Sequence, residues 1–216
     1  MCLVCLVADR DGAPIVGLDL GAGRAWSAAV AAWRTGRIEA IAVAPGIPGI
    51  EAQEKRDKVP RGVYGKLVEI GALHVSEGLR VQPPAQLWNA IIAKWGEPEV
   101  TVCDRFRIGE LQDCANGADI VPRVTRWSEA AADIRSLRKM ALDGPLSCAQ
   151  SSRALIAASL SAAMVENDKQ GSMRLIKRGT NNTGRDDVAA ALTLAAGALQ
   201  TALSIPRDSP YGGLIG

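Results

Sequence analysis

Acidic residues stand at three places where the chain pattern would bring a carboxylate to the end of a secondary-structure element. Asp19 and Asp104 each close a short apolar run that is typical of a buried strand. Asp186 and Asp187 precede an Ala- and Leu-rich stretch that is typical of a helix. A carboxylate at the end of a buried strand is costly unless it is paired or binds a cation. Because hard cations such as Mg²⁺ and Mn²⁺ take carboxylate oxygens, the pattern indicates a divalent-cation site for phosphoryl-group chemistry.

Phosphodiester hydrolysis by two cations needs three or four carboxylates that converge from separate elements. Two Mg²⁺ or Mn²⁺ ions about 3.5–4 Å apart can clamp the phosphodiester, one activating water and the other stabilising the leaving 3′-oxygen. We predict Asp19, Asp104 and Asp187 as the catalytic carboxylates and metal ligands. Consecutive helical residues point about 100° apart, so at most one of Asp186 and Asp187 binds a cation directly. The metal set includes Asp186 as the alternative ligand or as a helper that caps the helix.

Each of these carboxylates also has a simpler structural explanation. Asp19 suits a turn at a strand end, and Asp104 suits an ion pair with its neighbour Arg105. The helix dipole alone favours an Asp in the first turn of a helix, which applies to Asp186 and Asp187. One shared cation site accounts for all of these positions together, so we prefer it.

Basic residues close to these carboxylates are candidates for contacts with DNA phosphates. Lys177, Arg178 and Arg185 flank a Gly-, Asn- and Thr-rich loop just before the acidic pair. Arg105 directly follows Asp104. Cations beside a metal site can hold the phosphate backbone without reading its sequence. An ordinary solvated loop is an equally good explanation of the first group.

Composition is that of a folded domain. The chain has 216 residues, of which 48% are hydrophobic and 22% charged, so we expect a single domain over residues 1–205 and a flexible tail over 206–216. A net charge of +2 does not by itself argue for nucleic-acid binding. Five cysteines without a framework spacing predict reduced thiols in a cytosolic protein. We expect neither a signal peptide nor a membrane-spanning stretch.

The sequence lacks the motifs of other common catalytic sites or contains only one of their residues. The phosphate-loop pattern GxxxxGK[ST] does not occur, so the chain has no Walker A motif. A serine–histidine–acid site would depend on His74, which is the single histidine and stands in a polar context. Trp127, beside Arg123 and Arg126, is a further candidate for a DNA contact, although core packing is the simpler role.

The element pattern predicts an α/β fold with a mixed sheet of five or more strands and helices on both faces. The first three strands form an antiparallel meander and two later strands join in parallel, over 15–20, 26–33, 38–43, 100–103 and 120–124. A further short strand is expected over 173–177. Helices are expected over 51–58, 62–69, 87–95, 107–114, 128–142 (capped by Ser128), 147–167 and 186–203. This order resembles the ribonuclease H-like arrangement.

Four blocks in the chain resemble the C-terminal nuclease domain of phage terminase large subunits, the DNA-packaging motors of tailed phages. The block 16–21 (VGLDLG) is similar to that family's first-strand motif, and 102–106 (VCDRF) to its strand end with Asp-Arg-aromatic. The segment 57–78 matches the family's pattern of tyrosine, glycine and a final serine–x–glycine. The stretch 173–192 is similar to the last motif of that family, in which a lysine is followed by an aspartate and a helix with alanine and leucine.

The resemblance implies a metal-dependent endonuclease that cuts double-stranded DNA during genome packaging in the host cytoplasm. The family's acidic triad falls on Asp19, Asp104 and Asp187, with Asp186 as alternative, and two Mg²⁺ or Mn²⁺ ions are implied as cofactors. Implied partners are double-stranded DNA, an ATPase motor domain, the small terminase subunit and the portal. Because the chain has no Walker A motif, we do not expect it to translocate DNA alone.

Three other interpretations remain open from the sequence. A RuvC-like junction resolvase, or another ribonuclease H-like nuclease, shares the Gly-x-Asp strand and the late Asp-containing helix. The actin and sugar-kinase class shares the segment 17–21 but needs a second phosphate motif, which we do not find. A non-catalytic docking module for the packaging motor would keep the metal site only as a structural element.

Overall fold

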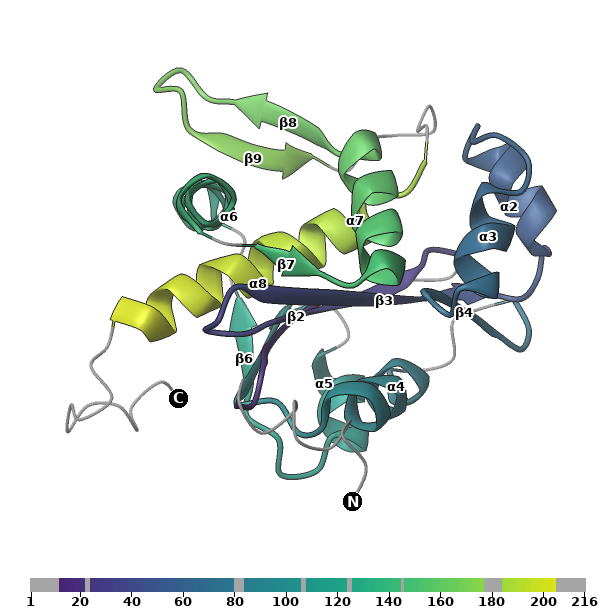
Figure 1. Ribbon diagram of the computed structural model, residues 1–216, viewed down its shortest axis with the longest axis horizontal. Coiled ribbons are helices and arrows are strands. Elements are labelled where there is room, and N and C mark those ends of the chain that lie inside the picture. The colour runs from purple at the N-terminus through teal and green to yellow at the C-terminus, as the bar shows by residue number, and fades with distance from the viewer. Residues whose placement is uncertain are drawn as a thin grey trace.

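The computed structural model describes residues 12–21, 24–79, 84–105, 108–123, 126–144, 146–176 and 184–204. Within these residues the chain forms a seven-stranded mixed sheet, a separate two-stranded hairpin and seven helices (Figure 1). The predicted α/β class with helices on both faces of a mixed sheet is confirmed. Residues 1–11 and the tail expected over 206–216 lie outside the described residues.

The centre of the sheet follows the predicted order. Strands β1 (Ile15–Asp19), β2 (Ser27–Ala32) and β3 (Arg37–Pro45) form the antiparallel meander. Strand β5 (Val100–Asp104) pairs in parallel with β1, and β6 (Ile120–Arg123) pairs in parallel with β5. Because β1 and β5 are parallel neighbours, their carboxyl ends lie at the same edge of the sheet.

Two short strands that were not placed from the sequence complete the seven-stranded sheet. Strands β4 (Leu73–Ser76) and β7 (Ser147–Cys148) both pair in parallel with β3, at different positions along it. His74 therefore lies on β4, which β3 and β2 separate from β1, and this placement argues against a serine–histidine–acid site with Asp19.

The helix predicted over 147–167 is wrong at both ends. Helix α7 covers only Gln150–Ala162, preceded by β7 and followed by strand β8 (Met164–Asn167). Strand β8 pairs with β9 (Met173–Ile176) as an antiparallel hairpin. At its turn, Asp168 Oδ1 accepts hydrogen bonds from the backbone N–H groups of Gln170 (2.8 Å) and Ser172 (2.7 Å). The turn chemistry of Asp168 thus overrides a sequence that is otherwise compatible with helix.

Helices cover the sheet on two faces and at one end (Figure 1). One face carries α6 (Trp127–Asp143), α7 and α8 (Asp187–Ser204), and the other carries α4 (Ala85–Trp95) and α5 (Ile108–Cys114). The short helices α2 (Ile50–Arg56) and α3 (Val63–Glu69) lie near β4 and α7. Helix α6 begins after Arg126, so the predicted capping role of Ser128 is wrong: Ser128 lies inside the first turn.

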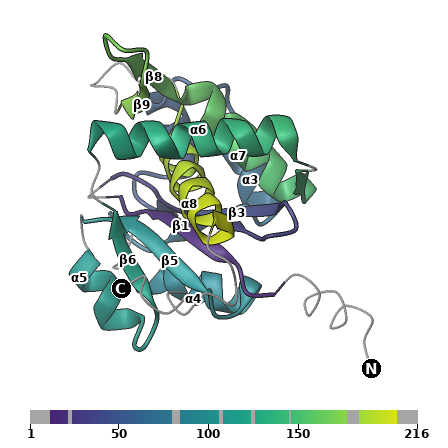
Figure 2. The same cartoon turned by 90° about the vertical axis from the view of Figure 1, so that its left-hand side faces the viewer.

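Two apolar cores lie on opposite sides of the sheet. Along β1, Ile15 packs into the core beneath α8, whereas Val16 and Leu18 pack into the core against α4 and α5. Helix α8 lies between the sheet and α6, as Figure 2 shows. By length and composition α8 could cross a membrane, contrary to the expectation from the sequence, but 67% of it is buried inside the fold, as in the core helix of a globular domain.

Candidate metal centre

A cavity of about 310 Å³ opens at the edge of the sheet where β1 and β5 end. We call it the acidic pocket. Its walls come from the ends of β1, β5 and β6, from α6, from β9 and from the start of α8. The lining residues that carry charge are Asp19, Asp104, Arg123, Asp133, Arg174 and Asp186.

Asp19, Asp104 and Asp186 reach the acidic pocket from three separate elements. Asp19 ends β1 and is only 5% exposed. Asp104 ends the neighbouring parallel strand, one position beyond the Leu18–Cys103 pair in the ladder. Asp186 directly precedes α8, and its carbonyl oxygen accepts the backbone N–H of Ala190 at 3.0 Å. Carboxylates from two strand ends and from the residue before α8 thus line one cavity.

Asp187 lies elsewhere, although it is the next residue. It is buried, and its two carboxylate oxygens accept hydrogen bonds from Arg185 Nε (2.8 Å) and Nη2 (2.9 Å). Burial raises the pKa of Asp187, and the Arg185 guanidinium acts in the opposite direction. Asp187 does not line the acidic pocket. The structure therefore does not bring together the triad of Asp19, Asp104 and Asp187 that the sequence analysis preferred.

Sequence reasoning missed a buried ion pair in the wall of the acidic pocket. Asp133 of α6 is 3% exposed and accepts hydrogen bonds from Arg123 Nη2 (2.5 Å) and Nε (3.3 Å). Burial raises the pKa of Asp133, and the Arg123 guanidinium partly offsets this effect. Arg123 stands beside Asp104 in the β5–β6 ladder. A guanidinium held in this way next to the carboxylates could contact a bound phosphate.

The close packing around Asp133 also explains a glycine in α8. A Cβ added to Gly197 would lie 1.9 Å from Asp133 Oδ1. Only glycine therefore lets α6 approach α8 with this carboxylate between them. No local sequence signal identifies Asp133, because its partner Arg123 and the glycine facing it come from other elements.

Arg174 of the hairpin forms a second basic part of the pocket wall. Its guanidinium carbon lies 4.0 Å from the centre of the Trp127 ring, and Nη2 lies 3.0 Å from Glu166 Oε2. Cation–π stacking of this kind fixes an arginine while leaving donors for another ligand. Trp127, which the sequence marked as a possible DNA contact, thus serves as a platform for Arg174.

The predicted DNA-contact residues fall in different environments. Arg105 is exposed directly after Asp104, next to the acidic pocket. The side chain of Arg185 is only 18% exposed and is paired with Asp187, so it does not offer a free surface cation. Lys177 and Arg178 lie outside the described residues.

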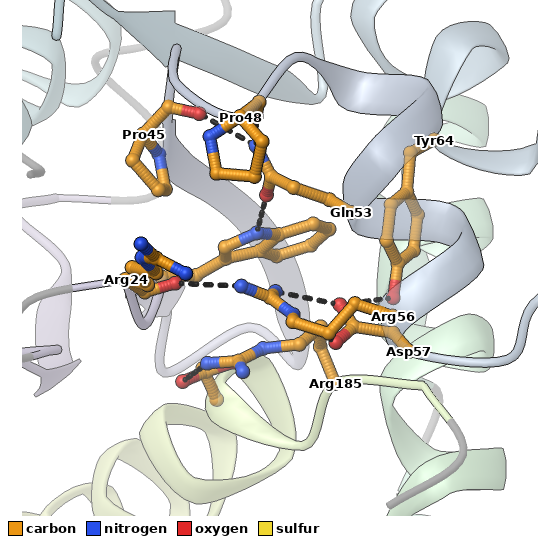
Figure 3. Close-up of polar contacts among 10 residues, drawn as sticks. Arg24, Pro45, Pro48, Gln53, Arg56, Asp57, Tyr64 and Arg185 are labelled. Carbon is orange, nitrogen blue, oxygen red and sulfur yellow. Dashed lines mark hydrogen bonds and ion pairs between the residues drawn. The ribbon is translucent and has the colours of Figure 1, made fainter. Parts of the chain in front are cut away.

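A buried polar network surrounds Arg185 on the α2–α3 side (Figure 3). Trp26 Nε1 donates to Gln53 Oε1 at 2.9 Å, and Gln53 Nε2 donates to the carbonyl oxygens of Pro45 (2.6 Å) and Pro48 (3.0 Å). The fully buried amide of Gln53 thus finds three partners, as a buried polar group requires. The ring of Trp26 faces the guanidinium of Arg185, whose carbon lies 5.9 Å from the ring centre.

The donor set of the acidic pocket suits a hard divalent cation. Besides Asp133, which is paired with Arg123, it supplies three carboxylates, and such oxygens are the preferred ligands of Mg²⁺ and Mn²⁺. Among the described residues, no three acidic, histidine or cysteine side chains already stand close enough together to hold a metal ion. The chemistry of the residues therefore fits a cation, although the described carboxylates are not gathered in a ligand geometry.

Comparison with known proteins bears on the fold. No family model matches the chain, and no curated protein matches it. The large terminase of bacteriophage HK97 superposes with a TM-score of 0.71 at 22% identity, over 86% of this chain. The chain spans only 39% of that terminase. The large terminase nuclease from the thermophilic phage G20c gives a TM-score of 0.51 at 16% identity, over 86% of this chain and 82% of that one. At the level of the fold the predicted resemblance is confirmed: the chain has the ribonuclease H-like fold of the large terminase nuclease domain.

Proposed function

We propose that the chain is a metal-dependent endonuclease that hydrolyses phosphodiester bonds of double-stranded DNA. The observation that carries this proposal is the arrival of Asp19, Asp104 and Asp186 in one cavity, from two parallel strand ends and the start of a helix. Carboxylates from separate elements are the donor set that two-cation phosphodiester hydrolysis requires. The fold shared with the G20c terminase nuclease supports the same reading.

The three carboxylates would hold the cations. Asp19 comes from the central strand and is nearly enclosed, whereas Asp104 and Asp186 are half-buried and stand closer to solvent. When bound, a pair of Mg²⁺ or Mn²⁺ ions would supply an activated water and charge stabilisation for the leaving 3′-oxygen. We assign the role of direct ligand to Asp186 in place of Asp187, because Asp187 is committed to Arg185.

Basic side chains in the wall of the acidic pocket would orient the DNA. Arg123 and Arg174 are the cations that line the acidic pocket, and each is already held by a neighbour. A fixed guanidinium loses little conformational entropy when it contacts a phosphate. Arg105, exposed at the end of β5, is positioned to add a contact further along the backbone. Contacts with phosphates carry no sequence information, so we expect weak sequence preference.

We propose a role in phage genome packaging for this nuclease. The similarity to the HK97 large terminase supports this setting, and the chain spans 39% of that protein. The ATPase motor domain, the small terminase subunit and the portal are therefore proposed partners in the host cytoplasm. In packaging, this domain would cut the double-stranded DNA.

A cleavage assay with three substrates tests the proposal. Purified protein is incubated with supercoiled plasmid, linear duplex or a four-way junction, in Mn²⁺, Mg²⁺ or EDTA. We expect nicking and linearisation of the plasmid with a cation, none in EDTA, and cutting of linear duplex at least as fast as of the junction. Strong preference for the junction would favour a resolvase instead. Cation binding without any cleavage would contradict the proposal and favour a docking module.

A further inference from the structure

The entry to α8 is held by buried polar contacts that the proposed hydrolysis does not use. Arg185 and Asp187 form a two-pronged ion pair in which both side chains are largely buried, 18% and 8% exposed. Asp186, between them in sequence, faces the acidic pocket. Adjacent side chains at a helix start point in different directions, so while Arg185 holds Asp187, Asp186 can face the acidic pocket.

A second set of contacts holds the same turn from the α2–α3 side. The backbone N–H of Gly184 donates to the carbonyl oxygen of Asp57 at 2.5 Å. Gly184 has a φ of +78°, and a Cβ there would lie 2.9 Å from the Cβ of Ala162. Both facts require glycine, since other residues avoid this backbone conformation. The chain therefore enters α8 along a path that Asp57 and Ala162 define.

Asp57 is itself fixed by its neighbours (Figure 3). Its carboxylate accepts two hydrogen bonds from Arg56, at 2.7 and 2.9 Å, and one from the hydroxyl of Tyr64 at 3.2 Å. The Tyr64 ring packs edge-on against Trp26 at 4.6 Å between ring centres. The guanidinium of Arg185 thus lies near Trp26 (just before β2), Asp57 (just after α2) and Tyr64 of α3. Burial acts to lower the pKa of Arg185, whereas the carboxylates of Asp187 and Asp57 raise it.

We propose that Arg185 and Asp187 are positioning residues that aim Asp186 into the acidic pocket, supported by Asp57 and Tyr64. The inference rests on the proposed function in one respect, namely that Asp186 binds a divalent cation. It assigns different roles to two adjacent carboxylates: one faces the cation and the other anchors the helix. It also gives a role to the segment that contains Asp57 and Tyr64, which cation binding alone leaves unexplained.

Mn²⁺ affinity, measured by isothermal titration on the whole chain without DNA, tests this assignment. Asp186→Asn should weaken binding by more than about 100-fold, as expected for loss of a direct ligand. Arg185→Lys and Asp187→Asn should each weaken it by about 10- to 100-fold, the range typical of residues that orient a ligand. The double variant should bind no more weakly than the worse single variant, because both changes remove the same contact.

Matched controls separate positioning from general damage to the fold. Arg61→Lys alters an exposed arginine, 83% exposed and paired with Glu51, and Asp113→Asn alters an exposed carboxylate on α5. Both controls should leave Mn²⁺ affinity unchanged. Thermal unfolding in EDTA shows whether each variant is folded.

If Asp187→Asn or Arg185→Lys does not fold, Tyr64→Phe decides the question. It removes a single hydroxyl and should lower Mn²⁺ affinity by about tenfold, with a melting temperature near that of the wild type. Unchanged affinity in that variant would overturn the positioning role.

The remaining outcomes are also distinguishable. Loss of binding in Asp187→Asn equal to that in Asp186→Asn, or additive losses in the double variant, would make Asp187 a direct ligand and overturn the inference. Failure of the wild-type chain to bind Mn²⁺ would overturn the proposed function itself, and the assignment with it.

Discussion

Gly17 of β1 lies directly against the backbone of α8 at Ala191. A Cβ added to Gly17 would lie 2.1 Å from the carbonyl oxygen of Ala191 and 2.5 Å from the backbone nitrogen of Ala195. The glycine of the Gly-x-Asp motif therefore lets the helix that carries Asp186 approach the strand that carries Asp19. This contact sets the separation of two walls of the acidic pocket.

Substitution of Gly17 by alanine should destabilise the protein. The clash is with backbone atoms, which cannot rotate away, and overpacking of this kind typically costs about 1–3 kcal/mol or more. Urea denaturation of Gly17→Ala measures the change. The matched control is Gly109→Ala on α5, where a Cβ would meet nothing within 4 Å. Equal stability of the two variants would contradict the close packing of α8 on β1.

Glu54 should make stability depend on pH in the acid range. It is buried and accepts hydrogen bonds from the backbone N–H groups of Gly62 (2.8 Å), Tyr64 (2.6 Å) and Gly65 (3.2 Å) at the start of α3. Burial acts to raise the pKa of Glu54, but these three donors lower it below its ordinary value of 4.5. Because the pKa of Glu54 is lower in the folded than in the unfolded state, the ionised carboxylate stabilises the protein at pH values above its ordinary pKa. This stabilisation is lost as the pH falls through the pKa of the folded state.

Comparison of Glu54→Gln with the wild type checks this sign. At neutral pH the variant should be less stable by about 1–3 kcal/mol, because an amide cannot accept all three hydrogen bonds as a charge does. The difference should shrink as the pH is lowered below the ordinary pKa of glutamate. Glu69→Gln, an exposed change at the end of α3, is the control. A difference between wild type and Glu54→Gln that stays constant across the acid range would contradict the account.

Cys103 should be chemically inert in the folded protein. Burial, together with the neighbouring Asp104 carboxylate, raises the pKa of its thiol to about 12. The thiolate is the reactive form, so almost none exists near neutral pH. Brief treatment with iodoacetamide followed by peptide mass spectrometry should leave Cys103 unmodified, while Cys148, which is half-buried on an edge strand, reacts faster. Rapid modification of Cys103 under native conditions would show that β5 is less enclosed than described.

The central sheet could be predicted because its signals are local. Alternating and continuous apolar runs mark β1 to β3 and β5, and the turn at Gly36 has the positive φ of +87° that glycine permits. Strands β4 and β7 could not be predicted, since β7 has only two residues and exists through its pairing with Arg37 and Ile38. A strand that forms only by pairing with a distant strand need not show an alternation of apolar and polar residues in its own sequence.

The site could be predicted where strand geometry decides it. Parallel neighbours bring their carboxyl ends together, so Asp19 and Asp104 follow from the order of β1 and β5. The choice between Asp186 and Asp187 depends on Arg185 and on contacts with α2 and α3, which are distant in sequence. Asp133 could not be found for the same reason, because its partner Arg123 comes from β6.

Cleavage of supercoiled plasmid in Mn²⁺ by single Asp→Asn variants tests the central claim most directly. We expect Asp19→Asn, Asp104→Asn and Asp186→Asn each to lose activity by at least about 100-fold, because a group that binds the catalytic cation is removed. Asp113→Asn should cleave like the wild type. Circular dichroism confirms that each variant is folded. Wild-type rates of cleavage in folded Asp19→Asn or Asp104→Asn would contradict the assignment of the acidic pocket as the nuclease site.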